Sequence, residues 1–278
     1  MDKYRSFIVW GAAAVLILAV FLGFVLAGWT GEPDKCIDEK PTTCYCEDFN
    51  RKDVLSGAPG VRQPVNTWFN LYAIGTSFLV ALFVYFDRER FSSGGAPNLI
   101  RSTSLAADLY VFAVLFLGLG SMWFHASLTK WGGILDGVSM YVYAAFLFFY
   151  TIRRFWDSAV FFWVGYFTAV ILFTFLHAVG VPSLINIIIL VAAYLAAEVY
   201  IWIRTGKIMQ GKPETIVLWV FAALSILAAT FFWAVSQTGN FMCDPKSFFQ
   251  PHGLLWHPLA GVMAVLLYFY WRAADDPV

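Results

Sequence analysis

The stretch Leu105–Ile152, LAADLYVFAVLFLGLGSMWFHASLTKWGGILDGVSMYVYAAFLFFYTI, decides the fold class of this chain. It holds two apolar runs, residues 105–124 and 134–152, joined by a short polar segment. Each run is close to the roughly 20 residues that an α-helix needs to cross a bilayer. Neither run shows the alternation of polar and apolar residues that is typical of lipid-facing barrel strands. The stretch therefore predicts two consecutive transmembrane helices.

The composition extends this prediction to the whole chain. Of the 278 residues, 60% are hydrophobic and 13% are charged, whereas soluble domains carry about 25% charged residues. The eight expected spans cover residues 7–28, 67–86, 105–124, 134–152, 159–179, 183–203, 215–235 and 253–271. Backbone polar groups must be satisfied within each span in lipid. The sequence therefore predicts an all-α, polytopic helix bundle, and no basic tract suggests a nucleic-acid partner.

The basic residues indicate how the bundle is oriented. They precede the first span and follow the second, fourth, sixth and eighth, as Lys3, Arg5, Arg88, Arg90, Arg101, Arg153, Arg154, Arg204, Lys207, Lys212 and Arg272. Cytoplasmic loops carry an excess of Lys and Arg. We therefore expect an integral, multi-pass membrane protein with both termini on the cytoplasmic side.

The first span allows two interpretations. Its basic start is typical of a secretory signal, but its apolar core is longer than the 7–15 residues of such a signal. We expect a retained membrane anchor rather than a cleaved segment.

All four cysteines fall on the non-cytoplasmic side of this topology, where disulfides form and persist. Cys44 and Cys46 offer a C-x-C pair to a soft metal, which is the less favoured interpretation. We expect Cys46 to pair with Cys243, and Cys36 with Cys44, although sequence alone does not fix the connectivity.

Three reactive side chains lie at the outer side of the third and fourth spans. Ser121 and His125 are four residues apart, so they share one helical face. Asp136 opens the fourth span, across a short turn. Ionisable residues within spans are costly and are usually functional.

The histidines gather toward the same membrane face. His252 and His257 open the eighth span in QPHGLLWHPLAG, and His177 ends the fifth. Three histidines with one open position are a catalytic zinc site. Asp136 is then suited to orient a ligand histidine or to act as general base on the metal-bound water. Ser121, one turn from His125, is suited to donate a hydrogen bond to a developing oxyanion.

Each of these residues also has an ordinary structural explanation. A histidine at the headgroup level is satisfied by water, and a serine in a span bonds the carbonyl four residues back. An aspartate is favoured at a helix N-terminus. The convergence of all these residues on one face favours the functional interpretation.

The spacing of His252 and His257 is a geometric difficulty. Five residues on a regular helix separate two side chains by about 140°. Pro251 suits a helix start, so His252 can lie in an irregular first turn. Alternatively, a π-bulge at Leu254–Leu255 realigns the two histidines.

Polar residues elsewhere in the spans have structural explanations. We expect Asp108 and Glu198, near the cytoplasmic ends, to pair with arginines near the headgroups or to contact Asn70 or Ser104. Asn66 and Asn70 share a face one turn apart, and we expect them to pack against the metal-binding helices by hydrogen bonds.

The segment GLGSMWFHASLTKWGGILD, residues 118–136, resembles the G-S-x-x-F-H segment of the alkaline ceramidases, which is followed eleven residues later by Asp. QPHGLLWHPLAG is similar to the H-x-x-W-H segment of their last helix, and CEDFN and QPVNTW resemble their N-terminal motif. The resemblance covers about residues 44–272. These hydrolases belong to a wider superfamily of seven-span proteins that includes the progestin and adipoQ receptors.

The resemblance implies a seven-helix hydrolase domain over residues 66–278, preceded by a Cys-containing loop at 31–65 and an additional N-terminal span at 1–30. It implies zinc held by His125, His252 and His257, with Ser121 and Asp136 assisting amide hydrolysis. The implied substrate is a ceramide-like N-acyl sphingoid lipid of the membrane, cleaved to a fatty acid and a sphingoid base. His257 follows the family pattern through "WH", whereas an extra leucine separates it from His252.

Calcium is a second cofactor that the resemblance suggests. Glu47, Asp48 and Asn50 resemble part of the acidic calcium-binding segment of the eukaryotic ceramidases, but Gln63 stands where a further acidic ligand is needed. The sequence therefore favours a solvated acidic loop over a calcium site.

Two other functions stay open at this point. A receptor or signalling protein of the same superfamily would use the same residues to hold a structural metal. A haem-type electron carrier is disfavoured, because its axial histidines face each other deep in the spans, and these lie near one surface.

Overall fold

A computed structural model describes residues 2–37, 45–92, 94–205 and 212–274 of the chain. Eight of its helical segments are long and apolar enough to cross a membrane, as predicted. They are α1 (Arg5–Ala27), α3 (Pro64–Phe69) with α4 (Tyr72–Arg90), α5 (Leu105–Ser127), α6 (Lys130–Phe155), α7 (Ala159–Ala178), α8 (Ser183–Thr205), α9 (Pro213–Val235), and η5 (His252–Trp256) with α10 (His257–Ala273). The described residues contain no strand beyond one isolated bridge between Pro33 and Thr129. The predicted all-α polytopic bundle is confirmed.

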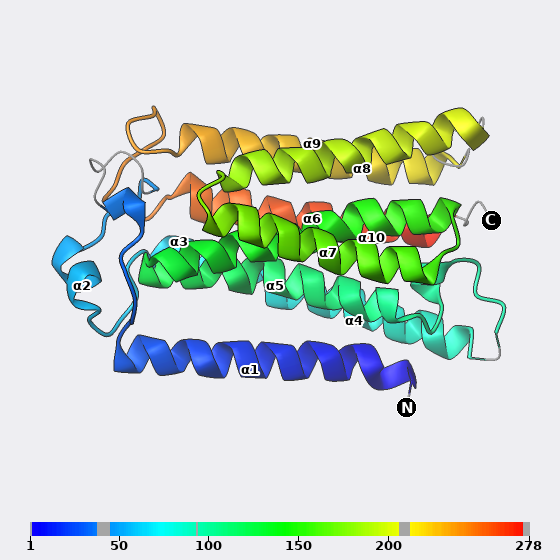
Figure 1. Ribbon diagram of the computed structural model, residues 1–278, viewed down its shortest axis with the longest axis horizontal. Helices are drawn as coiled ribbons and strands as arrows, with labels where there is room; N and C mark the ends of the chain where they lie inside the picture. Colours follow the sequence, from blue (N-terminus) through cyan, green and yellow to red (C-terminus); the bar gives the residue numbers. More distant parts are fainter. Residues whose placement is uncertain (1, 38–44, 93, 206–211, 275–278) are drawn as a thin grey trace.

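The helices run side by side along the long axis of the molecule (Figure 1). The start of α1 and the end of α10 lie at one end, and the short helix α2 (Arg51–Ser56) lies with its loop at the other. The helices α5 and α6 are the most deeply buried spans and pack closely on each other. The first helix packs along α4 and α5, so it is one of the helices of the bundle.

A very short turn connects α5 to α6. Leu128 ends α5 in the left-handed conformation, with φ 52°, and Thr129 then caps α6 by accepting from the Gly132 N–H. Further along, α5 and α6 approach so closely at Gly120 that a Cβ there would lie 2.4 Å from Cβ of Ser139. Because α6 begins at Lys130, Asp136 lies within its second turn. The expectation that Asp136 opens the helix is wrong, because Thr129 supplies the cap seven residues earlier.

The second span is broken near its outer end. Between α3 and α4 the backbone tightens, and Asn70 and Leu71 each donate to the carbonyl three residues back. The side chain of Asn70 donates to the Asn66 carbonyl at 2.8 Å. Short stretches of this tighter geometry inside a helix often mark functional positions. Here the break turns Asn70 toward the last helix.

Buried ion pairs join the helices at the end away from α2. Asp108 of α5 accepts from Arg88 of α4 and from Arg5 of α1, and Ser6 also donates to it. Glu198 of α8 accepts from Tyr270 at 2.9 Å. The prediction that Asp108 pairs with arginines is therefore confirmed.

Candidate metal centre

Three histidines from two spans come together at the end of the bundle nearest α2. His125 belongs to the last turns of α5, His252 begins η5, and His257 begins α10. All three are buried, and one nitrogen of each lies within 4.8 Å of the others. Nε2 of His252 lies 3.2 Å from Nε2 of His125. No other group of three or more metal-binding side chains of this kind occurs among the described residues.

A π-helical turn brings His252 and His257 together. Residues His252–Trp256 form this turn, and the His257 N–H donates to the carbonyl of His252, five residues back. An i→i+5 turn sets residues five apart nearly one above the other, which a regular helix does not. The imidazole rings of the two histidines are 4.6 Å apart between centroids. The predicted π-bulge is confirmed.

Gln63 fixes the orientation of His125. Its side-chain nitrogen donates to the carbonyls of Tyr45 and Glu47, at 3.2 and 3.0 Å. The other end of the amide, Oε1, therefore faces Nδ1 of His125 at 2.8 Å and accepts from it. The proton of a neutral His125 is thus on Nδ1, and the lone pair of Nε2 faces the other histidines. A ligand histidine is commonly held by such a partner.

Two asparagines of the second span lie against the last helix; the predicted hydrogen bond to a metal-binding helix is made by Asn70, whereas the Asn66 side chain packs there without one. Nδ2 of Asn70 lies 3.3 Å from Nε2 of His257. Gly253 packs against Asn66 so closely that a Cβ would lie 2.9 Å from the Asn66 side-chain oxygen. The break between α3 and α4 therefore positions the second span against the histidine cluster.

Ser121 and Asp136 lie next to each other, from α5 and α6. The two side chains are close enough to interact, and neither belongs to the histidine group. Asp136 is also within electrostatic range of Tyr45 and Tyr72. These tyrosines stack on His252 and His257, with ring centroids 3.9 and 6.3 Å apart. The serine and the carboxylate thus share their neighbours with the histidines.

The fourth histidine lies apart from this cluster. His177, near the end of α7, packs its ring against Gly137 and contacts the ring of Tyr141 edge-on. The expectation that the four histidines lie toward one face is compatible with this position, but only three of them form the close group.

The outer loop covers the cluster and is tied to the far end of the chain. A disulfide joins Cys46 to Cys243, which confirms that predicted pairing. Cys36 is also disulfide-bonded, and its expected partner Cys44 lies outside the described residues. Burial raises the pKa of the Tyr45 phenol, and Asp136 raises it further, so the phenol is protonated at neutral pH.

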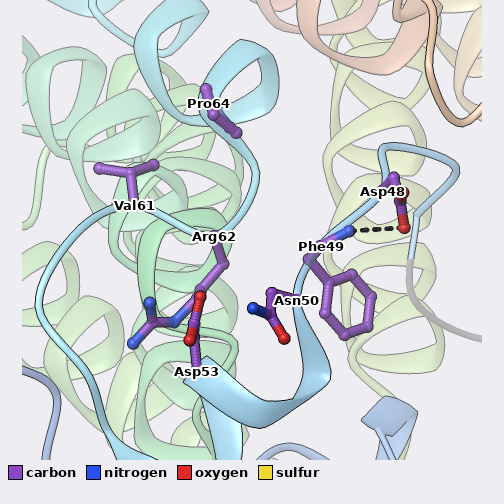
Figure 2. Close-up of a pocket in the computed structure, with 7 residues that line it drawn as sticks. All are labelled: Asp48, Phe49, Asn50, Asp53, Val61, Arg62 and Pro64. Atoms are coloured by element: carbon purple, nitrogen blue, oxygen red, sulfur yellow. Dashed lines mark hydrogen bonds between the residues drawn. The ribbon is translucent and has the colours of Figure 1, made fainter.

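Acidic residues of the same loop bind backbone groups. Both carboxylate oxygens of Glu47 accept from the first N–H groups of α3, those of Val65 and Asn66. Burial raises the pKa of Glu47, and these two hydrogen bonds lower it in part. A cavity of about 400 Å³ lies beside this segment (Figure 2). Its lining includes Asp48, Asn50, Asp53 and Arg62, with Arg62 beside Asp53.

The residues at the centre fit a metal ion. Neutral imidazole is the commonest nitrogen ligand of metals in proteins, and buried nitrogens without partners are costly. Nε2 of His125 and Nε2 of His252 face each other at 3.2 Å in this buried centre, where an ion bound between them would accept both lone pairs. Three imidazoles with a carboxylate nearby form the donor set of a catalytic zinc site. The cluster can therefore hold a metal.

Sequence reasoning did not identify Gln63 or Tyr45 as part of this centre. In the sequence, Gln63 stands out only because it occupies a position where a calcium site would need an acidic residue. Its contact with His125 joins residues 62 positions apart, which no local pattern reveals. Tyr45 carries no signal of its own beyond its place next to Cys46.

The comparison with protein families agrees with this geometry. A family model described as Ceramidase matches residues 63–275, a range that contains Gln63, Ser121, Asp136 and the three clustered histidines. No curated protein sequence matches the chain. The family implies an amide hydrolase. By this match over most of its length, the chain belongs to the ceramidase family.

Proposed function

We propose that this protein is an intramembrane, zinc-dependent hydrolase that cleaves the amide bond of ceramide-like N-acyl sphingoid lipids, releasing a fatty acid and a sphingoid base. The observation that carries the proposal is the buried group of His125, His252 and His257, with Ser121 and Asp136 alongside. The family match supports the amide as the bond that is cleaved.

The three histidines would hold the ion. When bound, zinc supplies Lewis acidity that polarises a carbonyl group and makes water more acidic. Asp136 is the general base that takes a proton from the attacking water and delivers it to the nitrogen of the leaving sphingoid base. Ser121 donates its hydroxyl hydrogen to the carbonyl oxygen as that oxygen gains negative charge.

The supporting residues hold this arrangement without touching the substrate. Gln63 keeps the lone pair of His125 Nε2 directed into the centre. Tyr45 and the disulfide close the outer side of the centre. Exclusion of bulk water strengthens the interaction of Asp136 with the reacting groups. The lipid reaches the centre from within the bilayer, with its acyl chain among apolar helix surfaces.

The orientation and domain division follow the same proposal. The end that carries the buried arginines is cytoplasmic by the distribution of basic residues, so both termini are cytoplasmic and the metal centre is toward the other face. Residues 66–278 form the hydrolase domain, 31–65 the Cys-containing loop and 1–30 an added anchor.

The test is fatty-acid release from a panel of N-acyl sphingoid lipids by the purified protein, with and without a zinc chelator. We expect release that the chelator abolishes, that zinc restores and that His125→Ala lacks. His177→Ala is the matched control, because His177 lies outside the cluster. A folded protein that retains zinc and releases no fatty acid from any lipid would favour a receptor with a structural metal.

A further inference from the structure

One side-chain amide, that of Gln63, bridges the outer loop and the metal centre. Nε2 of Gln63 donates to two backbone carbonyls, those of Tyr45 and Glu47, on either side of Cys46. Oε1 of the same amide accepts from His125. Gln63 is fully buried, so these bonds form away from water. The neutral amide of Gln63 therefore joins the loop to the ligand histidine by hydrogen bonds, beside the direct ring contacts of Tyr45.

This arrangement does not fit the calcium site that the resemblance to alkaline ceramidases suggests. Calcium binds six to eight oxygen ligands. The carbonyls of Tyr45 and Glu47 already accept N–H groups from Gln63, and both carboxylate oxygens of Glu47 accept from the start of α3.

The other two candidate ligands also serve local backbone. Oδ1 of Asp48 accepts from the Phe49 N–H, and Oδ1 of Asn50 accepts from the Lys52 N–H as the cap of α2. Figure 2 shows the two side chains apart from each other along the cavity. Within the described part of the loop, no three acidic side chains converge on one point.

We propose that the side-chain amide of Gln63 takes the place of a cation, so that the outer loop and the metal centre are coupled without calcium. The two hydrogens of the amide nitrogen carry partial positive charge and satisfy the two carbonyls that a cation would otherwise bridge. The oxygen of the amide meanwhile positions His125. Gln63 is thus a positioning residue, acting on the centre through His125.

The substitution Gln63→Glu distinguishes this proposal from the alternative, in which a calcium ion is bound at the loop. Gln63→Glu keeps an acceptor for Nδ1 of His125 but replaces the NH₂ donor with a second carboxylate oxygen. That oxygen would face the carbonyls of Tyr45 and Glu47 with no hydrogen between them. A buried charge without a partner is costly, so the variant needs a cation at this position.

The experiment measures the Tm and the zinc content of the purified full-length protein in EGTA and in calcium, with free zinc held constant. We expect the wild-type protein to have the same Tm and the same zinc content in EGTA and in calcium. We expect Gln63→Glu to have a Tm several degrees lower and to bind zinc about 10- to 100-fold more weakly in EGTA, and calcium to restore both. Gln237→Glu, whose amide donates to the Trp233 carbonyl and not to the loop carbonyls that Gln63 satisfies, is the control and should show no response to calcium.

Three results would overturn the proposal. They are a wild-type protein whose Tm falls in EGTA and recovers with calcium, a Gln63→Glu protein as stable as the wild type in EGTA, and a destabilised Gln63→Glu protein that calcium does not restore. The inference deepens the proposed metal site. The Tm does not depend on lipid turnover. A failure of the inference about Gln63 is therefore distinguishable from a failure of the proposed hydrolase activity.

Discussion

Oε1 of Gln63 and Nδ1 of His125 lie 2.8 Å apart, although 62 residues separate them in the chain. This contact decides which nitrogen of His125 carries the proton. It also connects the start of the second span to the end of the third, and thereby connects the outer loop to the centre.

The histidine cluster predicts the stoichiometry of metal binding. We expect one zinc per chain in the wild type and a large loss of zinc in His125→Ala, His252→Ala and His257→Ala, because each removes one of three ligands. His177→Ala should retain the wild-type content, since that ring packs on Gly137. Elemental analysis of the detergent-purified proteins measures this, and zinc loss in His177→Ala alone would contradict the assignment.

Asp136 should affect the rate without affecting the metal. Asp136→Asn keeps the shape of the side chain but cannot accept a proton, so we expect kcat to fall by about 10²–10⁴ while the zinc content stays at one per chain. Steady-state kinetics on the best ceramide of the panel provide the measurement. Asp157→Asn, just beyond the end of α6, serves as the control. A protein that lost its zinc on Asp136→Asn would indicate a metal ligand instead of a general base.

The π-helical turn makes a prediction about chain length. A π-bulge is a one-residue insertion in an α-helix, so deletion of Leu255 should restore a regular turn with histidines four residues apart. Residues four apart also share a face, and we expect the deletion variant to bind zinc. Insertion of one alanine after Leu255 places the histidines six apart and should abolish zinc binding. Equal zinc contents in the two variants would argue against this interpretation.

The disulfide should stabilise the centre together with the fold. Cys46 and Cys243 are separated by 197 positions, and loss of such a bond commonly costs about 2–5 kcal/mol of the free energy of unfolding. We expect the Cys46→Ser/Cys243→Ser protein to have a lower Tm and weaker zinc binding, because the loop also carries the carbonyls that orient Gln63. An unchanged zinc affinity in the less stable double variant would show that the loop acts on the fold alone.

The ion pair at the opposite end gives a prediction about stability. Arg88 and Asp108 are both buried and share two hydrogen bonds. Removal of Arg88 leaves Asp108 with Arg5 and Ser6 as partners, so the cost should stay below the about 3–5 kcal/mol of a buried charge that loses its whole partner. Arg88→Ala should still lower the Tm, and exposed Arg90 on the same helix offers a control in Arg90→Ala. Similar Tm values for the two variants would contradict the buried network.

The number of spans could be predicted from the sequence because it depends on local patterns, whereas the set of His125, His252 and His257 came from the resemblance to the alkaline ceramidases, since the pattern alone gathers all four histidines toward one face. Apolar runs of fixed length define the spans, and Ser121 with His125 lie on one helical face whatever the surrounding fold. The five-residue spacing of His252 and His257 left two alternatives, an irregular start after Pro251 and a π-bulge, and the structure contains the π-helical turn.

Contacts between distant segments could not be predicted in the same way. The break at Asn70 depends on its packing against Gly118 and on the position of the last helix. The sequence predicts a helix start near Asp136, because the apolar run begins only at residue 134. The helix begins earlier, at Lys130, because Thr129 caps it. Gln63 is an uncharged residue beside a proline, and only the fold brings it to His125.

The positions of the three histidines along the chain also determine when, during synthesis, their cluster can assemble. His125 lies in the third span, whereas His252 and His257 open the eighth. A nascent chain therefore has one histidine of the cluster between residues 125 and 252 and gains the other two only when its final helix is synthesised. Cys243, the partner of Cys46, is synthesised shortly before them. Neither the complete histidine cluster nor the Cys46–Cys243 bond can therefore form before the last tenth or so of the described chain is synthesised, and a chain interrupted before residue 252 has the early helices of the bundle without the cluster.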